Sequence, residues 1–278
     1  MEKIQWRKLS RSEIQKKELA ILLYVQQFCQ KNQIKFYLAG GTLLGAIRHK
    51  GFIPWDDDID ICMPRPDYER FVATFSGENK NLIIISNRLG NWEAPFAKVV
   101  DLSITVKSQF HEDETHLWID VFPIDGLPKD RKNVANIYKK VSFLRRVYLL
   151  GNARLGEGKK MIYRWLKYIL KPLVRAYGVN RLSKMIEAIA MKFAYEDSEY
   201  VGAVTWGLYG VGERMLKAEF EKSVLVEFEG HQFPAMSCWD SYLTGIYGDY
   251  MQLPPVEKRQ THDMIVYELI IDISVVFK

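Results

Sequence analysis

Cysteine and long apolar runs are both scarce in this chain of 278 residues. It holds three cysteines, Cys29, Cys62 and Cys238, which are scattered and odd in number. They form neither a disulfide framework nor a paired CxxC metal site, so a reducing, cytoplasmic setting is favoured. No uncharged run reaches the ~20 residues of a membrane-spanning helix, because Glu268 and Asp272 interrupt the apolar C-terminal stretch. The N-terminus lacks the apolar stretch of a signal peptide, and we therefore expect a cytoplasmic globular protein.

Acidic residues are nearly missing from the middle of the chain. Residues 131–192 hold 16 Lys and Arg residues and only two acidic residues, Glu157 and Glu187. The rest of the chain holds 23 basic and 32 acidic residues, although the net charge of the whole is only +5. Such a polarised chain is expected to have a surface made for an anionic partner.

The segment 158–178 within this basic region has the pattern of an amphipathic helix, with basic residues flanking an apolar side. Three interpretations stay open. The segment is a solvated helical face, or it docks on an anionic membrane surface, or it binds nucleic acid. Nothing that resembles a base-reading module accompanies it, so no nucleic-acid partner is expected.

Helical and strand patterns alternate in the first 130 residues. The predicted helices are 10–33, 42–49 and 66–75, and the predicted strands are 34–41, 58–63, 81–86, 96–101, 103–108 and 116–124. This order predicts an α/β (α+β) fold with a mixed-sheet core. We expect a catalytic core in 1–130, a basic helical insertion in 131–195, and a C-terminal part in 196–278 that completes the core.

Four aspartates gather within residues 55–66, which read WDDDIDICMPRP. If 58–63 is a strand, its period of two places Asp58 and Asp60 on one face and the isoleucines between them on the other. Two carboxylates on one strand face can converge on a single Mg²⁺ or Mn²⁺ ion. The alternative is an acidic turn with solvated carboxylates. Asp56 shares the face of Asp58, whereas Asp57 is expected to point away as a solvated turn residue.

A glycine pair precedes the aspartates. Gly40-Gly41-Thr42 follows a predicted strand and opens a predicted helix, which presents backbone N–H groups to an anion. The stretch has the G-x-x-x-x-G of a P-loop but continues with Ala46-Ile47, which excludes a Walker site. A Gly-Gly turn alone can be merely a turn. A Gly-Gly-Thr turn that lies upstream of an Asp-x-Asp strand is a far more specific signal of a functional site than a Gly-Gly turn alone.

This combination of Gly-Gly-Thr and Asp-Ile-Asp-Ile resembles the nucleotidyltransferase superfamily. The longer stretch YLAGGTLLGAIRHKGFIPWDDDIDICMPRPDYERF, residues 37–71, is similar to the signature of the LicD family, which includes phosphocholine transferases and fukutin-type transferases. The resemblance continues through FAKVVD (96–101), WIDVFPIDGLP (118–128) and YGDYMQLPPVEKRQTH (247–262). It spans most of the chain apart from the basic helical segment.

The resemblance implies a reaction and a donor set. A family member would move phosphocholine or a similar phospho-alcohol from a CDP-activated donor such as CDP-choline. The acceptor would be a hydroxyl of a cell-surface glycan, a lipid-linked oligosaccharide or a teichoic acid precursor, and CMP would be released. Asp58 and Asp60 would hold Mg²⁺. Asp120, among apolar residues, would complete the metal site or take the acceptor proton; a structural hydrogen-bonding role is its alternative, and Asp125 is expected in a turn.

Further residues are candidates for substrate contact. The substrate-binding set is Gly40, Gly41, Thr42, Arg48, Lys98, Arg259 and His262. Ordinary surface or ion-pair roles compete for Arg48 and Lys98. Four tryptophans could supply the cation–π face that a choline head group needs, although core packing competes for each: Trp55, Trp92, Trp118 and Trp206.

Two other functions stay open. One is a template-independent nucleotidyltransferase acting on RNA or a small molecule, which would release pyrophosphate rather than CMP. The other is a catalytically silent membrane- or glycan-binding protein. The resemblance also implies acceptors assembled on lipid carriers at the cytoplasmic membrane face, which makes peripheral contact with the membrane through 158–178 the more useful hypothesis.

Overall fold

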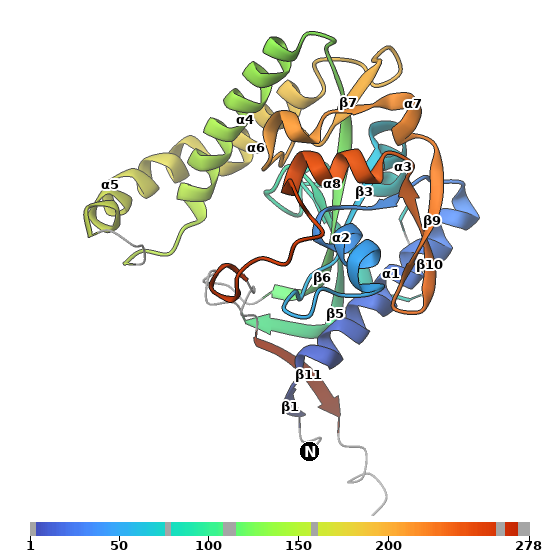
Figure 1. Ribbon diagram of the computed structural model, residues 1–278. Helices are drawn as coiled ribbons and strands as arrows, with labels where there is room; N and C mark the ends of the chain where they lie inside the picture. Colours follow the sequence, from blue (N-terminus) through green and yellow to red (C-terminus); the bar gives the residue numbers. More distant parts are fainter. Residues whose placement is uncertain (1–3, 76–78, 108–114, 157–160, 260–264, 272–278) are drawn as a thin grey trace, which may run out of the picture.

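A mixed β-sheet forms the centre of the protein in the computed structural model, which describes residues 4–75, 79–107, 115–156, 161–259 and 265–271 (Figure 1). The sheet order is β1-β11-β5-β6-β3-β2, with β4 also paired to β5 and β7 paired to β6 and β8. The strands are β1 (Ile4–Lys8), β2 (Tyr37–Leu38), β3 (Asp60–Pro64), β4 (Leu82–Ser86), β5 (Ala97–Lys107), β6 (Thr115–Leu127), β7 (Tyr200–Gly202), β8 (Met215–Leu216), β9 (Ser223–Phe228), β10 (His231–Met236) and β11 (Ile265–Ile271). The predicted α/β class is confirmed.

Helices cover the sheet and extend beyond it. They are α1 (Arg11–Asn32), α2 (Gly40–His49), α3 (Arg65–Thr74), α4 (Arg131–Asn152), α5 (Met161–Tyr177), α6 (Val179–Ala190), α7 (Lys217–Phe220) and α8 (Trp239–Tyr247), with the 3₁₀ turns η1 (Gly210–Glu213) and η2 (Val256–Lys258). α1 begins at a capping box, in which the Ser10 hydroxyl accepts from the Glu13 N–H and the Glu13 carboxylate accepts from the Ser10 N–H. No helix in these described ranges is long and apolar enough to cross a bilayer.

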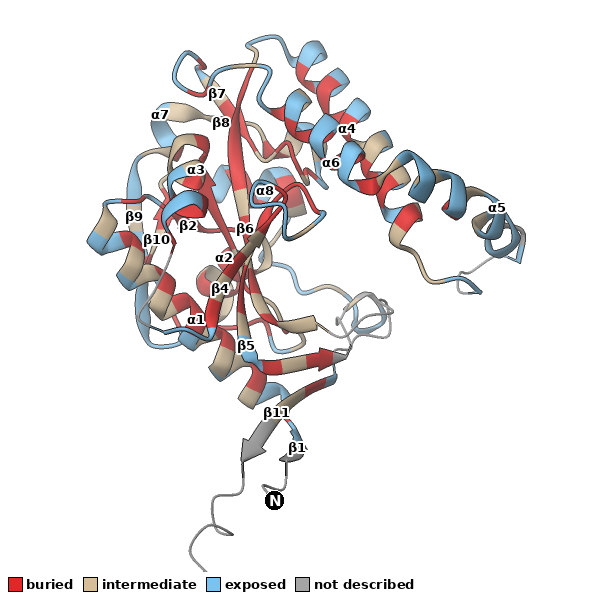
Figure 2. Cartoon of the chain, turned by 180° about the vertical axis from the view of Figure 1, so that it is seen from behind, coloured by how far each residue is buried: buried red, intermediate tan, exposed pale blue. Residues whose placement is uncertain are grey.

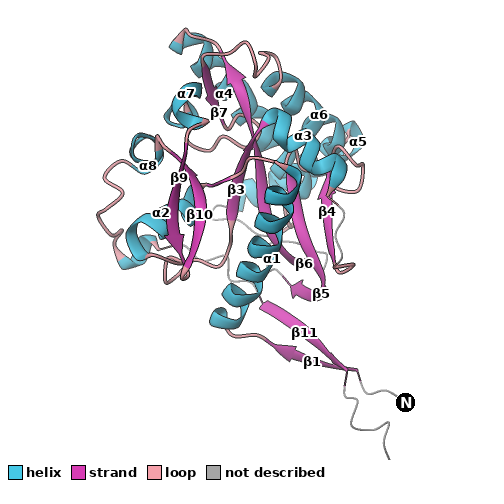
Figure 3. Cartoon of the chain, turned by 90° about the vertical axis from the view of Figure 1, so that its right-hand side faces the viewer, coloured by secondary structure: helices cyan, strands magenta, loops and turns pink. Residues whose placement is uncertain are grey.

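The two faces of β6 have opposite characters. Leu117, Ile119 and Val121 are fully buried, on the face against which α1 packs (Figure 3). Between them, Trp118 and Asp120 alternate onto the other face and are only half-buried. One face of β6 therefore belongs to the hydrophobic core, and the opposite face carries the half-buried side chains of Trp118 and Asp120.

The basic middle of the chain forms a helical arm. α4 packs against α6 and α5, and α5 projects away from the body of the protein (Figure 1). Most of α5 is exposed, whereas the central strands are largely buried (Figure 2). The chain then returns to the sheet at β7, which pairs with the end of β6. The segment predicted to be helical thus contains α4, α5 and α6, and the three predicted domains, the insertion among them, stay a prediction.

Two of the predicted strands are shorter in the structure than expected, and two others are parts of one continuous strand. The strand predicted at 34–41 is limited to Tyr37–Leu38, because α2 already begins at Gly40, where φ is +51°. The strand predicted at 58–63 begins only at Asp60, so Asp58 lies in the extended segment before β3. The strands predicted at 96–101 and 103–108 are the single strand β5, which bends at a register shift opposite β6.

Candidate active site

Three charged residues lie in register on three neighbouring strands. Asp60 on β3 is paired with Asp120 on β6, and Asp120 is paired in turn with Lys98 on β5. The Asp120 N–H donates to the Ile59 carbonyl at 2.9 Å, which fixes β6 against the start of β3. Residues that are 60 and 22 positions from Asp120 along the chain are therefore side by side across the sheet.

The carboxylate of Asp120 has two neighbours. The Lys98 Nζ lies 3.2 Å from its Oδ1, and the Trp118 indole N–H donates to its Oδ2 at 3.3 Å. The Lys98 ammonium also lies 3.7 Å from the centre of the Trp118 ring and 5.2 Å from that of Trp92. Burial lowers the pKa of Lys98, and the Asp120 carboxylate opposes that shift. The position of Lys98 within a strand is confirmed; its predicted contact with phosphate stays a prediction.

Asp60 lies among other carboxylates. Burial raises its pKa well above the ordinary value, and the carboxylates of Asp58 and Asp120 raise it further. The neighbours Ile59 and Ile61 are fully buried. The predicted alternation of aspartates and isoleucines is therefore confirmed, although Asp58 precedes the strand that carries Asp60.

The carboxylates of Asp58, Asp60 and Asp120 are hard oxygen donors of the kind that Mg²⁺ and Mn²⁺ prefer. Within the part of the chain that the structure describes, no group of three or more His, Cys, Asp or Glu side chains is close enough to hold a metal unaided. Mg²⁺ commonly takes one or two protein carboxylates, with water and substrate phosphate oxygens as its remaining ligands. The mutual repulsion around Asp60 fits a bound cation, and the metal stays a prediction.

Gly40 and Gly41 leave room for two carboxylates. A Cβ on Gly40 would lie 2.9 Å from Asp60 Oδ2, and one on Gly41 would lie 2.7 Å from Asp56 Oδ2. The Thr42 hydroxyl, which is buried, accepts from the Asp60 N–H at 2.8 Å. The Gly-Gly-Thr turn therefore positions the acidic strand. Its predicted contact with an anionic substrate stays untested.

We expect Gly40→Ala to lower transferase activity at least ~10-fold, because a side chain at this position collides with the Asp60 carboxylate and even a small displacement of a reacting group is costly. The positive φ of Gly40 adds backbone strain. Gly90→Ala is the matched control, because Gly90 also has a positive φ (+71°) but faces open space. Thermal denaturation and initial rates of both variants separate strain from displacement; equal activity in both would contradict the proposed role of Gly40.

Asp57 is not the solvated turn residue that the sequence predicts. It is only 4% exposed, on the side of the segment that α1 covers. Glu18 of α1 is equally buried, its Oε2 atom has no hydrogen-bond partner, and burial together with the Asp58 and Asp57 carboxylates raises its pKa. The sequence prediction missed Glu18. The available signal was a charged residue on the apolar stripe of α1, four positions after Ile14.

Asp125 is also misplaced by the sequence, which predicts a turn after Pro123. β6 continues to Leu127 and pairs with β7, so Asp125 is an interior strand residue that is 1% exposed. Its two carboxylate oxygens accept from Arg65 Nε at 2.6 Å and from Arg65 NH2 at 2.9 Å. This buried, bidentate ion pair fastens α3 to the sheet.

The two predicted substrate-binding arginines contact other partners. Arg48 donates to the Tyr250 carbonyl at 2.7 Å and to His49 Nε2 at 2.9 Å, and burial lowers its pKa. The Arg259 guanidinium lies 4.3 Å from the centre of the Trp55 ring. Their predicted roles in substrate binding stay predictions, and His262 lies outside the described residues.

A pocket opens beside Asp60. Its lining residues are mostly apolar and aromatic: Ala39, Gly40, Asp60, Cys62, Phe122, Ile124, Ala203, Trp206, Gly207, Leu208, Tyr209, Glu213, Tyr242 and Tyr247. Of the four predicted tryptophans, Trp206 is the one in this lining. Glu213 is 4% exposed and its Oε1 accepts from the Tyr209 N–H at 2.8 Å. Burial raises the pKa of Glu213 to about 7. The sequence gave no signal for it, because Glu213 is far from every aspartate motif.

The sequence is similar to those of known proteins. Residues 33–147 match the family described as LicD/FKTN/FKRP, nucleotidyltransferase domain. The lipopolysaccharide cholinephosphotransferase LicD of Haemophilus influenzae is 35% identical over 92% of this chain and 97% of its own length. Mannosyltransferase regulator 4 of Saccharomyces cerevisiae is 29% identical over 41% of this chain but only 10% of its own. An uncharacterised protein of Rickettsia prowazekii, RP689, is 57% identical over 13% of this chain and 14% of its own.

Proposed function

The chain belongs to the LicD family, and on that premise we propose that it transfers phosphocholine, or a similar phospho-alcohol, from a CDP-activated donor to a hydroxyl of a cell-surface glycan. The observation that carries the proposal is the row of Asp60, Asp120 and Lys98 across three strands. The match to the Haemophilus relative over 92% of the chain supports a transferase. The name of the Haemophilus relative supports phosphocholine as the group and lipopolysaccharide as the acceptor; a teichoic acid precursor is the other acceptor class that the proposal admits.

The proposed step exchanges one phosphorus–oxygen bond for another. The acceptor hydroxyl oxygen attacks the phosphorus that carries choline, and the bond from this phosphorus to the bridging oxygen of the diphosphate breaks. CMP leaves with the bridging oxygen, and the hydroxyl proton passes to a base. Asp120 is our candidate for that base, because it lies beside Asp60 and its Oδ1 is 3.2 Å from the Lys98 Nζ.

A divalent cation, when bound, would neutralise the donor diphosphate. Asp58 and Asp60 are the residues that we propose to hold it, and Lys98 would contribute a fixed positive charge nearby. Without a cation, the carboxylates of Asp58, Asp60 and Asp120 would repel the diphosphate. The protein's own part in the reaction is to orient the donor and to accept the proton of the hydroxyl.

The direct test is an assay of CMP release from CDP-choline with Mg²⁺ and a lipid-linked or soluble glycan acceptor. We expect acceptor-dependent CMP release, with choline phosphate recovered on the glycan. CTP serves as the comparison donor. If CTP is consumed with release of pyrophosphate while CDP-choline is left intact, the chain is a nucleotidyltransferase and the proposal is wrong.

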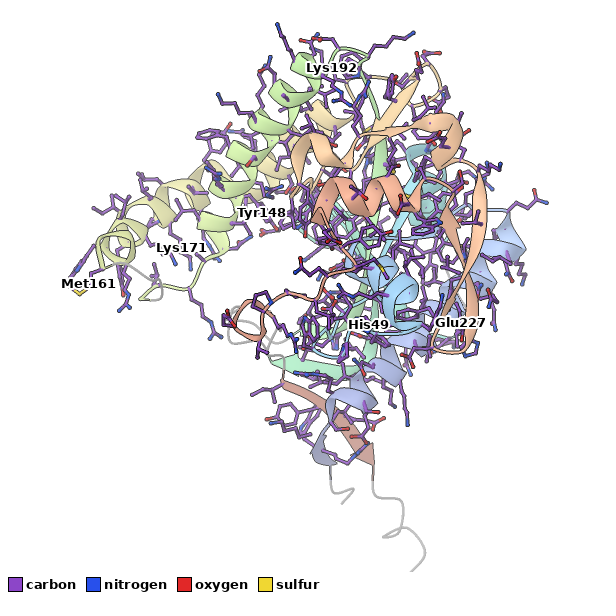
Figure 4. The ribbon with its side chains drawn as sticks, viewed as in Figure 1. His49, Tyr148, Met161, Lys171, Lys192 and Glu227 are labelled. Carbon is purple, nitrogen blue, oxygen red and sulfur yellow. The ribbon has the colours of Figure 1, made fainter. Side chains whose placement is uncertain are left out.

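The proposal includes contact between α5 and an anionic membrane surface, where a lipid-carried acceptor would be presented. Trp165, Ile169 and Leu173 repeat every fourth residue on α5 and are 69%, 65% and 62% exposed. The basic composition of the arm suits anionic lipid headgroups. Met161 lies at the outer end of the arm, and Tyr148 lies where the arm meets the body (Figure 4). The apolar stripe is therefore held away from the sheet.

We expect the triple variant Trp165→Ser, Ile169→Ser and Leu173→Ser to lose at least ~10-fold in affinity for vesicles that contain phosphatidylglycerol, because burial of three large side chains supplies several kcal/mol. Vesicle co-sedimentation measures the loss. Leu225→Ser is the control, because Leu225 is 68% exposed on β9, away from the arm. Activity on a soluble acceptor should be unchanged in both variants. Equal vesicle binding by wild type and triple variant would remove the membrane surface from the proposal.

A further inference from the structure

We infer that the pocket beside Asp60 is the specificity site for the transferred alcohol, and that Trp206, Tyr242, Tyr247 and Glu213 select a quaternary ammonium group there. The inference rests on the proposed function, and it goes further because it names the chemistry of the group that this site accepts.

The charges of the lining point to a cation. Asp60 and Glu213 are the carboxyl side chains among the lining residues, and no Lys or Arg is among them. The remaining walls are apolar or aromatic. Such a pocket repels a phosphate or a carboxylate and offers little hydrogen bonding to a polyol. A trimethylammonium group is positively charged but has no N–H group to donate in a hydrogen bond. Aromatic faces and a nearby carboxylate are therefore its usual partners.

The aromatic walls are held in place by their own contacts. The Tyr242 hydroxyl accepts from the Gly40 N–H at 3.3 Å, which connects α8 to the start of α2. Tyr209 and Tyr247 pack edge to face with ring centres 5.2 Å apart. Trp206 packs edge to face on Phe96 at 5.0 Å. The rings are thus ordered before any ligand binds, which lowers the entropic cost of recognition.

Two further contacts bring Glu213 to these rings. The backbones of η1 and α8 pass so close that a Cβ on Gly212 would lie 2.1 Å from the Gly245 carbonyl oxygen. Arg145 of α4 donates to the carbonyls of Trp206 and Gly207. The helical arm therefore holds the loop that carries Trp206, and the glycine contact holds the carboxylate against the aromatic wall.

The pocket also has the right position relative to the reaction. Asp60, which is paired in register with Asp120, is itself one of the residues that line the pocket. A donor whose phosphorus lies at Asp60 therefore has its alcohol next to the pocket. The ionised form of Glu213 opposes folding, because burial raises its pKa to about 7 even though the Tyr209 N–H and Arg145 oppose that shift. A bound quaternary ammonium would compensate that cost.

The test compares donors that differ only in the alcohol. Calorimetric titration with CDP-choline, CDP-glycerol and CMP, in the presence of Mg²⁺, is carried out on wild type, Glu213→Gln and Trp206→Leu. We expect wild type to bind CDP-choline at least ~10-fold more tightly than the neutral CDP-glycerol. Each variant should lose most of this difference, while its affinity for CMP stays within about twofold of wild type.

Matched controls keep a folding defect apart from a lost contact. Glu187→Gln removes another buried carboxyl, on α6, whose electrostatic partners are Arg88 and Arg65 rather than the pocket. Trp6→Leu removes an exposed Trp on β1. Both should retain the preference for CDP-choline. Unchanged affinity for CMP shows that a pocket variant is folded, and thermal denaturation checks this independently.

The outcomes separate the inference from the function beneath it. If wild type binds CDP-glycerol as tightly as CDP-choline, or if both pocket variants keep the preference, the inference is wrong. Transfer of glycerol phosphate by the same protein would leave the proposed phospho-alcohol transfer standing. If no CDP-alcohol is bound or consumed and CTP is used instead, the inference and the proposed function both fail.

Discussion

Replacing Asp60 with Asn should lower phosphotransfer by a factor of about 10³ or more while leaving the protein folded. Asp60 lies at one end of the row that it forms with Asp120 and Lys98, and it is paired in register with Asp120. The amide keeps the size of the side chain but loses its charge, and loss of a cation ligand or of preorganised electrostatics at a phosphoryl centre has effects of this order. Rates of CMP release at saturating CDP-choline and Mg²⁺ measure the loss.

The same variant should be more stable than wild type when divalent cations are absent. Burial and two neighbouring carboxylates raise the pKa of Asp60, so its ionised form opposes folding at neutral pH and this cost grows as the pH rises. Asn removes the cost. Melting temperatures in EDTA at neutral pH should therefore be higher for Asp60→Asn, and added Mg²⁺ should stabilise wild type more than the variant.

Asp197→Asn is the control for both measurements, because Asp197 is an exposed residue distant in sequence from Asp60 and Asp120. It should alter neither rate nor melting temperature. Near-normal turnover by Asp60→Asn would remove Asp60 from the reaction. A loss of activity accompanied by a lower melting temperature would instead assign it a structural role.

Replacing Asp125 with Asn should destabilise the protein by about 3–5 kcal/mol, because it leaves the guanidinium of Arg65 buried without its anionic partner. The Arg65 and Asp125 side chains are 7% and 1% exposed, and their closest contact is 2.6 Å. Urea denaturation measures the loss. Because the contact lies between α3 and β6, we expect the whole cooperative transition to shift to lower urea.

Two further variants distinguish a buried charge from an ordinary ion pair. The exposed pair Lys129–Glu199 has the same closest distance, 2.6 Å, and Glu199→Gln should change stability little. The double variant Arg65→Met with Asp125→Leu should recover much of the lost stability, since it leaves no unpaired charge. A loss for Asp125→Asn as small as that for Glu199→Gln would contradict a structural role for this pair.

The local sequence pattern was enough to predict that Asp60 and its isoleucine neighbours lie on opposite faces of a strand, because this alternation depends only on consecutive residues. Pattern could not show what covers each face. Asp57 looked like a solvated turn residue, but α1 covers it, and Glu18 on that helix is buried with it. These burials depend on packing between segments far apart in the chain.

The pairing of residues across the sheet could not be predicted from the sequence either. The sequence suggested Asp120 and Lys98 as separate candidates, and only strand pairing brings both next to Asp60. The family resemblance supplied Asp120, because its block continues past residue 118. Glu213 and the aromatic pocket depend on the contact between η1 and α8, which leaves no mark in either segment alone.

The place of β11 in the sheet constrains how the chain can fold as it is made. β11 lies between β1 and β5, with Ile4 opposite Ile271 and Lys107 opposite Ile265. Among the described residues, β1 therefore joins the sheet through β11 alone, although the two strands are far apart in the sequence. Until residues 265–271 leave the ribosome, the outer part of β5 lacks this partner, and an open strand edge is a template for association with other chains. The nascent protein therefore depends on rapid completion, or on a chaperone, to protect that edge.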